Sequence, residues 1–96
     1  MFVISLNYTS PLEQIDLLLE EHLEFLKEQY KERNFIASGG KIPRTGGVIL
    51  ALGNDKKTIE SIIKKDPFYK EGVAEYEITE FTPKMTLPEF SSLKEG

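Results

Sequence analysis

The residue of this chain best suited to chemistry is His22, its only histidine, which interrupts an apolar helical pattern. Its neighbours at helical spacing include Leu18, Leu19 and Leu26. Histidine is the side chain that exchanges protons near neutrality, because its unperturbed pKa is about 6.5. We therefore expect His22 to be either a hydrogen-bonded core residue or a general acid or base.

A histidine base needs a second group that orients the ring and stabilises its charged form, usually a carboxylate. Asp66, in the segment Lys65-Asp66-Pro67-Phe68, is the candidate. An aspartate before proline often only caps a turn. In the topology predicted below, however, the middle of the first helix can approach the end of the second. The sequence therefore offers His22 and Asp66 as a pair, with a structural hydrogen bond as the alternative to catalysis.

Other kinds of site find little support in the sequence. The absence of cysteine excludes disulfides and thiol catalysis, and a single histidine argues against zinc, so we expect no metal site. The glycines at 39–40 and 46–47 form no phosphate-binding motif, and no helix follows them. Arg44 could meet an anionic substrate, although a solvated loop charge is the simpler interpretation.

Composition limits the partners and the location. The net charge of −4 argues against nucleic acids and anionic membranes. No apolar run approaches the ~20 residues needed to span a bilayer. The first residues lack the basic and apolar regions of a signal peptide, so a cytoplasmic location is predicted.

Alternating apolar residues predict a first strand over residues 2–8. A helix should follow, with Ser10 as the N-cap, Pro11 at the first helical position and Glu13 closing a capping box. Its apolar stripe continues to about residue 33 or 34.

The rest of the chain predicts strand, loop, strand, helix and strand. The strands cover residues 35–39, 48–52 and 74–82, with a loop over 41–47 between the first two. Asn54 or Asp55 should cap the second helix, and Pro67 should stop it.

The order β-α-β-β-α-β with right-handed crossovers predicts an α+β, ferredoxin-like fold. A four-stranded antiparallel sheet would carry both helices on one face. Residues 1–83 would form this domain, and residues 84–96 a polar tail with two apolar anchors, Leu87 and Phe90.

The sheet face away from the helices is expected to be mixed in character. We assign to it Val3, Ser5, Asn7, Ile49, Ala51, Glu75, Glu77 and Thr79. A face that is neither fully polar nor fully apolar favours packing against a second sheet, which predicts a homodimer.

Several short motifs occur in a characteristic order: His22 in the first helix, Ser38-Gly39, Gly46-Gly47, Asp66-Pro67-Phe68 and the segment at 76–81. With these motifs the chain resembles the YciI-like (YCII-related domain) proteins over nearly its whole length. The resemblance implies a ferredoxin-like fold of the dimeric α+β barrel type and a catalytic His22–Asp66 dyad. At least one member of that family is a dehydrochlorinase acting on a chlorinated hydroxyquinol. This chain has Gly39-Gly40 where the family often has Gly-Pro.

Together these features predict a small-molecule enzyme that uses His22 and Asp66 for acid–base chemistry of the lyase or isomerase type, without a cofactor. Ser38, Gly39 and Phe68 are the predicted substrate-binding residues. The alternative is a non-catalytic module that binds a small ligand or only dimerises.

Overall fold

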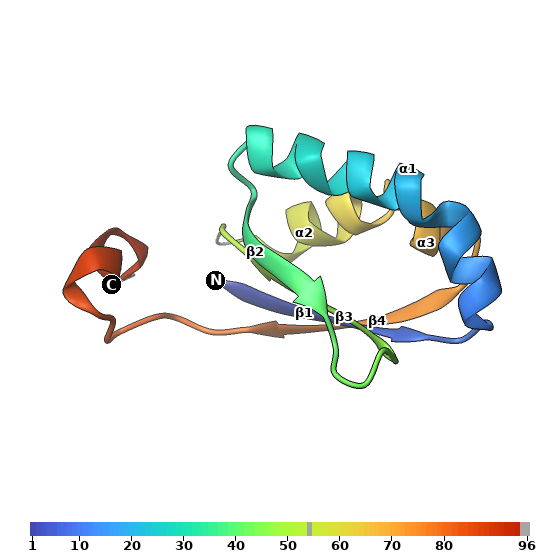
Figure 1. Ribbon diagram of the computed structural model, residues 1–96. Coiled ribbons are helices and arrows are strands. Elements are labelled where there is room, and N and C mark those ends of the chain that lie inside the picture. Colours follow the sequence, from blue (N-terminus) through green and yellow to red (C-terminus); the bar gives the residue numbers. More distant parts are fainter. Residues whose placement is uncertain (54, 95–96) are drawn as a thin grey trace.

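The computed structural model is an antiparallel sheet covered on one face by helices (Figure 1). It describes residues 1–53 and 55–94. In chain order the elements are β1 (Phe2–Tyr8), α1 (Leu12–Lys31), β2 (Phe35–Gly40), β3 (Gly46–Ala51), α2 (Lys56–Ile63), α3 (Pro67–Lys70), β4 (Ala74–Glu80) and a 3₁₀ helix, η1 (Pro88–Leu93).

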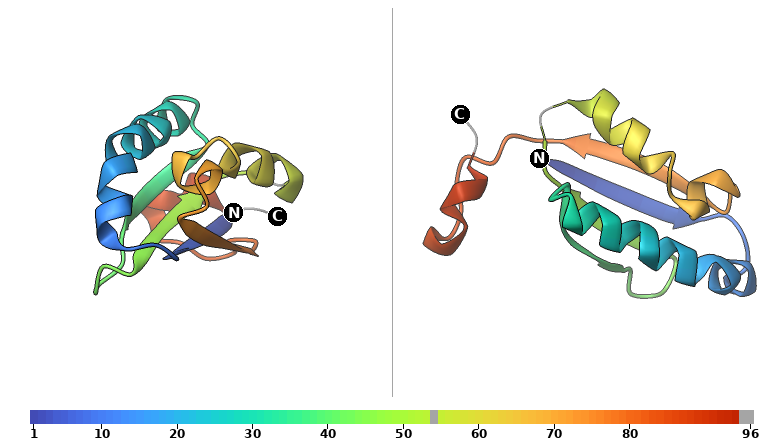
Figure 2. Two further views of the ribbon diagram at one scale, coloured as in Figure 1. Left: turned by 90° about the vertical axis from the view of Figure 1, so that its right-hand side faces the viewer. Right: turned by 90° about the horizontal axis from the view of Figure 1, so that it is seen from above.

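The strands lie in the order β2-β3-β1-β4, and every neighbouring pair is antiparallel. The first strand is therefore central, and the two βαβ crossovers place their helices on the same side. Figure 2 shows α1 and α2 side by side above the sheet. This is the α+β, ferredoxin-like fold that the sequence predicts.

The ends of α1 differ from the prediction. Ser10 is not the N-cap; Pro11 is, with an extended backbone (φ −59°, ψ 151°) whose carbonyl accepts from the amides of Gln14 and Ile15. The helix consequently begins one residue later and has no side-chain cap. It ends at Lys31, because Arg33 adopts a left-handed conformation with φ 62°.

The prediction that Ile49 and Ala51 lie on the open face is wrong. Ala51 pairs with Phe2 and Ile49 with Ile4, so all four side chains share the helix-covered face. All four are buried, with at most 3% of their surface exposed. The run at 48–52 is apolar throughout, so it carries no alternation from which its facing could be read. The open face instead receives the half-buried side chains of Val48 and Leu50.

The connection between α2 and β4 contains an element that the sequence analysis missed. Asp55 caps α2 by accepting a hydrogen bond from the Lys57 amide at 3.0 Å; Asn54, the other predicted cap, lies outside the described residues. The helix ends at Ile63, before Pro67, and Pro67 instead begins the short helix α3. Proline suits the first position of a helix, since its missing N–H needs no partner there.

The segment after β4 extends away from the sheet, beyond its end (Figures 1 and 2). Leu87 and Phe90 do not anchor it within one chain, because 62% and 51% of their surfaces are exposed. Residues 95–96 of the predicted tail lie outside the described residues. In the described part of the chain, no helix is long and apolar enough to cross a membrane.

Candidate active site

The structure brings His22 and Asp66 into direct contact. The Nδ1 atom of His22 lies 2.8 Å from Oδ1 of Asp66, although the residues are separated by 44 positions. His22 projects from the middle of α1, and Asp66 lies immediately before α3. The His22 side chain is 11% exposed and the Asp66 side chain is completely buried. The geometric condition for a dyad is met; its catalytic role remains a prediction.

Local structure explains why an aspartate is stable at this buried position. Asp66 is the N-cap of α3, in an extended conformation (ψ 127°) that Pro67 favours, and its Oδ1 accepts from the Phe68 amide at 3.0 Å. Its Oδ2 accepts a hydrogen bond from the Tyr76 hydroxyl at 2.5 Å. With His22, three donors converge on one carboxylate and compensate for its removal from water.

Tyr76 is a member of this network that the sequence analysis missed. It lies on β4, and its place in the alternating pattern put its side chain on the helix face, but nothing in the pattern linked it to Asp66. Burial, reinforced by the charge of Asp66 and the hydrogen bond to it, raises the pKa of Tyr76 well above the ordinary tyrosine value. The phenol therefore stays protonated and remains a donor to the carboxylate.

The same contacts fix the orientation of the imidazole. Because the carboxylate of Asp66 accepts at Nδ1, the hydrogen-bond pattern assigns the proton of the neutral ring to Nδ1 and leaves Nε2 with a free lone pair. The ring of Phe68 stacks on the imidazole, with centroids 4.0 Å apart and planes 7° from parallel. Phe25 packs nearby, at a centroid distance of 6.3 Å. The ring is thus held by its edge and by its face.

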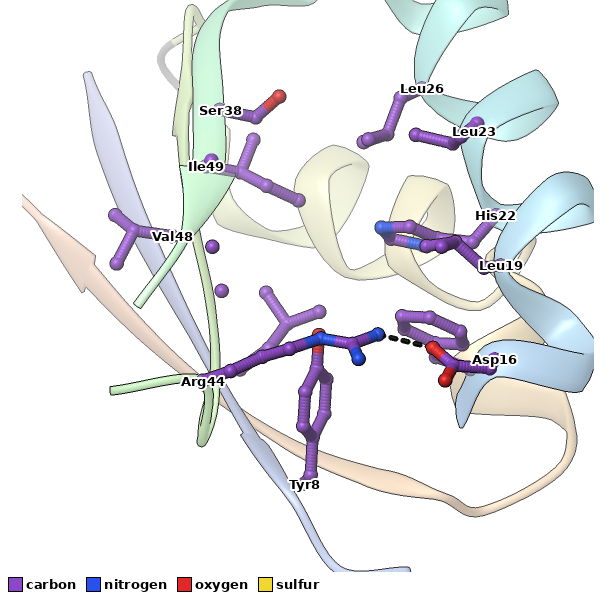
Figure 3. A pocket seen from close by; sticks show the side chains of 15 residues that line it. Tyr8, Asp16, Leu19, His22, Leu23, Leu26, Ser38, Arg44, Val48 and Ile49 are labelled. Carbon is purple, nitrogen blue, oxygen red and sulfur yellow. Dashed lines mark hydrogen bonds and ion pairs between the residues drawn. The ribbon is translucent and has the colours of Figure 1, made fainter. Parts of the chain in front are cut away.

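His22 borders a cavity of about 470 Å³ between α1 and the sheet (Figure 3). Figure 3 shows the ring directed from α1 towards the strands of the opposite wall. Most of the lining is hydrocarbon, from Leu6, Leu19, Leu23, Leu26, Ile49 and Phe68. Asp66 is not part of the wall; it lies behind the ring. A base held in a mostly apolar cavity can take a proton from an enclosed small molecule.

The predicted substrate-binding residues Ser38, Gly39 and Phe68 all border this cavity. The hydroxyl of Ser38 lies 2.5 Å from that of Tyr30, so it faces the helix layer. The structure therefore places the three residues around one space, while their role in binding stays a prediction.

Glycines shape the floor of the cavity. Gly40 pairs with Gly47, and Gly47 pairs with the buried Leu6, so this row of the helix-covered face carries two positions without side chains. A Cβ atom added at Gly40 would meet no atom closer than the Gly46 carbonyl oxygen, at 3.9 Å. The missing side chains at Gly40 and Gly47 thus leave room for a ligand at the floor of the cavity.

A metal centre has no ligand set in the described residues. Over residues 1–53 and 55–94, no three histidine, cysteine, aspartate or glutamate side chains gather as metal ligands would. The chemistry that the described site can perform with its own groups is proton transfer at His22.

The fold and site together define a ferredoxin-like domain with a buried His–Asp pair beside a cavity. Residues 1–82 match the YCII-related domain, and the chain belongs to this family.

Among solved structures, the chain is similar to the 5-chloro-2-hydroxyhydroquinone dehydrochlorinase (TftG) from Burkholderia phenoliruptrix AC1100, in complex with 2,5-dihydroxybenzoquinone. The TM-score is 0.71 at 16% sequence identity, and the match covers 86% of this chain and 95% of that one. At this identity the similarity establishes the fold alone. The search of curated proteins gave no match.

Proposed function

We propose that this protein is a cofactor-independent enzyme that performs acid–base chemistry, of the lyase or isomerase type, on a small cyclic hydroxylated compound. One observation carries the proposal: the buried carboxylate of Asp66 lies 2.8 Å from Nδ1 of His22, and the ring of His22 borders a cavity. That arrangement gives the imidazole one nitrogen for orientation and one for chemistry.

In the proposed step, Nε2 of His22 removes a proton from the enclosed substrate. In an elimination, the electron pair of the broken bond forms a new double bond, and the leaving group departs with its own bonding pair. The imidazolium formed faces the carboxylate of Asp66, which stabilises it, and then returns its proton to solvent. A well-placed base contributes roughly 10²–10⁴ in rate, so positioning by the cavity must supply much of the remainder.

Loss of HX from a halogenated hydroxylated ring is the first reaction to test. The support is indirect: a protein of the same fold is a dehydrochlorinase of 5-chloro-2-hydroxyhydroquinone. The cavity of about 470 Å³ is of a size that suits small organic ligands.

The experiment measures chloride release from 5-chloro-2-hydroxyhydroquinone, together with binding of 2,5-dihydroxybenzoquinone by titration calorimetry. We expect His22→Asn to lower turnover at least a hundredfold and to remain folded, because asparagine can still donate to Asp66. Glu28→Gln, on the exposed side of the same helix, is the matched control and should retain full turnover. Equal turnover by the wild-type protein and His22→Asn refutes a base at this position. Binding without turnover of any hydroxylated ring points to the ligand-binding module instead.

The proposal includes a homodimer and a cytoplasmic location. Support for a second copy comes from the open sheet face, where the half-buried Val3, Val48 and Leu50 lie among polar side chains. The exposed apolar side chains of the tail, including Met85 at 91%, would gain burial against a second copy. Sedimentation that shows only monomer at high micromolar concentration refutes the dimer, and cell fractionation tests the location.

A further inference from the structure

The cavity beside His22 has a cation at its mouth. Arg44, in the loop between β2 and β3, borders the cavity, and its Nη2 atom lies 2.5 Å from Oδ1 of Asp16 on α1. Figure 3 shows the arginine side chain extending from the strand side across to the helix. Among the cavity-wall residues that the structure describes, Arg44 is the only one with a permanent positive charge.

The backbone of this loop is well anchored. The Tyr8 amide donates to the Thr45 carbonyl at 2.9 Å, and the Lys41 amide donates to the Gly46 carbonyl at 2.9 Å. A third bond, from the Thr45 amide to the Pro43 carbonyl at 2.7 Å, closes the turn around Arg44 itself. The guanidinium is therefore presented at the mouth by a fixed backbone, as recognition of a ligand requires.

The ion pair between Arg44 and Asp16 contributes little to the stability of the fold. Their side chains are 43% and 55% exposed, and exposed ion pairs contribute little to folding. The hydrogen bond to Asp16 raises the pKa of Arg44, so the guanidinium stays charged. An incoming anion can take the place of the Asp16 carboxylate on this guanidinium and gain a bidentate contact, while Asp16 returns to water.

The other polar contacts of the cavity fit the same ligand. Ser38, whose hydroxyl is paired with Tyr30, offers a hydrogen bond from β2, and most of the remaining wall is hydrocarbon. Removal of a proton by His22 would leave negative charge on the ligand, and a guanidinium close to it would stabilise that charge.

We propose that Arg44 binds an anionic oxygen of the ligand, so that the ligand of this cavity is a small cyclic carboxylate or phenolate. The inference rests on the proposed function, because it assigns a chemical class to the molecule that His22 would deprotonate. When no ligand is bound, the carboxylate of Asp16 occupies the position on the Arg44 guanidinium that the ligand's anionic oxygen would take.

The test compares 4-hydroxybenzoate with its neutral analogue 4-hydroxybenzamide, which has nearly the same shape. Titrations followed by amide NMR shifts give both dissociation constants, and shifts at Gly40 and Gly47 locate the probe in the cavity. We expect the wild-type protein to bind the carboxylate at least about tenfold more tightly than the amide. Arg44→Gln should remove this preference, whereas Asp16→Asn should strengthen binding of the carboxylate because the competing anion is gone.

Lys41→Gln is the matched control. Lys41 is a cation of the same loop, but its Nζ atom donates to Asn7 at 2.8 Å and it does not border the cavity. This variant should keep the preference for the carboxylate. The inference is overturned if the wild-type protein binds the two probes equally, if Arg44→Gln retains the preference, or if neither probe binds at about 10 mM.

These outcomes separate the inference from the proposed function. If Arg44→Gln leaves the preference intact while His22→Asn abolishes turnover, only the anionic class is wrong. If Arg44→Gln removes the preference while His22→Asn keeps full turnover, the base is wrong and the anion site stands.

Discussion

Replacement of Tyr76 by phenylalanine tests the hydrogen bond that the Tyr76 hydroxyl donates to Oδ2 of Asp66. His22 contacts the other carboxylate oxygen, Oδ1. The substitution removes one hydroxyl and leaves Oδ2 of a completely buried carboxylate without its 2.5 Å donor. Hydrogen bonds to charged groups contribute roughly 1.5–3 kcal/mol, and a buried acceptor left unsatisfied pays its full desolvation penalty. We therefore expect Tyr76→Phe to lower the free energy of unfolding by about 2–3 kcal/mol.

Urea denaturation monitored by circular dichroism measures this loss, and the midpoint of thermal unfolding should fall by roughly 8–20 °C for a chain of this size. Tyr69→Phe is the matched control, because Tyr69 packs against Tyr76 at a ring distance of 5.8 Å but is 44% exposed. That variant should change stability by less than about 0.5 kcal/mol. A loss below about 0.5 kcal/mol in Tyr76→Phe would contradict a buried, hydrogen-bonded carboxylate at Asp66.

The pH dependence of the free energy of unfolding provides a second, independent test of the Tyr76 contact. The pKa of Tyr76 is raised in the folded protein, mainly by burial, so folding favours the neutral phenol. The contribution of Tyr76 to the free energy of unfolding is fully present below the pKa of an unfolded tyrosine, about 10, and declines as the pH rises above that pKa. The stability difference between the wild-type protein and Tyr76→Phe should therefore shrink above about pH 10. A difference that stays constant from neutral to alkaline pH would show that the Tyr76 hydroxyl is not buried against Asp66.

Two further substitutions test the cavity and the dyad. Gly40→Val should fill the floor of the cavity and weaken binding of 2,5-dihydroxybenzoquinone at least tenfold, since a Cβ atom there has 3.9 Å of clearance and the fold should tolerate it. Ala37→Val, on the open face of the same strand, is its control, and equal affinity in both variants would place the ligand elsewhere. Asp66→Asn should lower the free energy of unfolding by about 1–2 kcal/mol, because charge-assisted hydrogen bonds become neutral ones. In a chloride-release assay it should also lose most turnover; full turnover would leave the carboxylate without a role beyond capping α3.

The fold followed from patterns that are local and periodic. Alternation in the strands predicted at residues 2–8 and 74–82, the apolar stripe of the first helix and the turn signals between the elements predicted the order of the four strands and two long helices. Right-handed crossovers then determined the sheet. What failed were features decided by tertiary pairing. The uniformly apolar segment at 48–52 could not reveal its register, so Ile49 and Ala51 were placed on the wrong face.

The residues of the site likewise fall into those that local sequence patterns identified and those that depend on tertiary contacts. His22 could be singled out because an ionisable ring among leucines breaks an apolar stripe, and Asp66 because of its position before Pro67. Tyr76 could not be connected to them, since its contact with Asp66 depends on how β4 lies beneath α3. The short helix α3 was missed because Pro67 can end one helix or begin another, and only packing of the buried Phe68 decides between the two.

The measurement that tests the central claim most directly is the tautomer of His22. Long-range ¹H–¹⁵N NMR spectra of the neutral ring distinguish the protonated nitrogen from the nitrogen that carries the lone pair. The account predicts a proton on Nδ1, held by Asp66, and a free Nε2 whose resonance moves when 2,5-dihydroxybenzoquinone is added. A proton on Nε2 would contradict the account, and so would an Nε2 resonance that does not shift when the ligand binds.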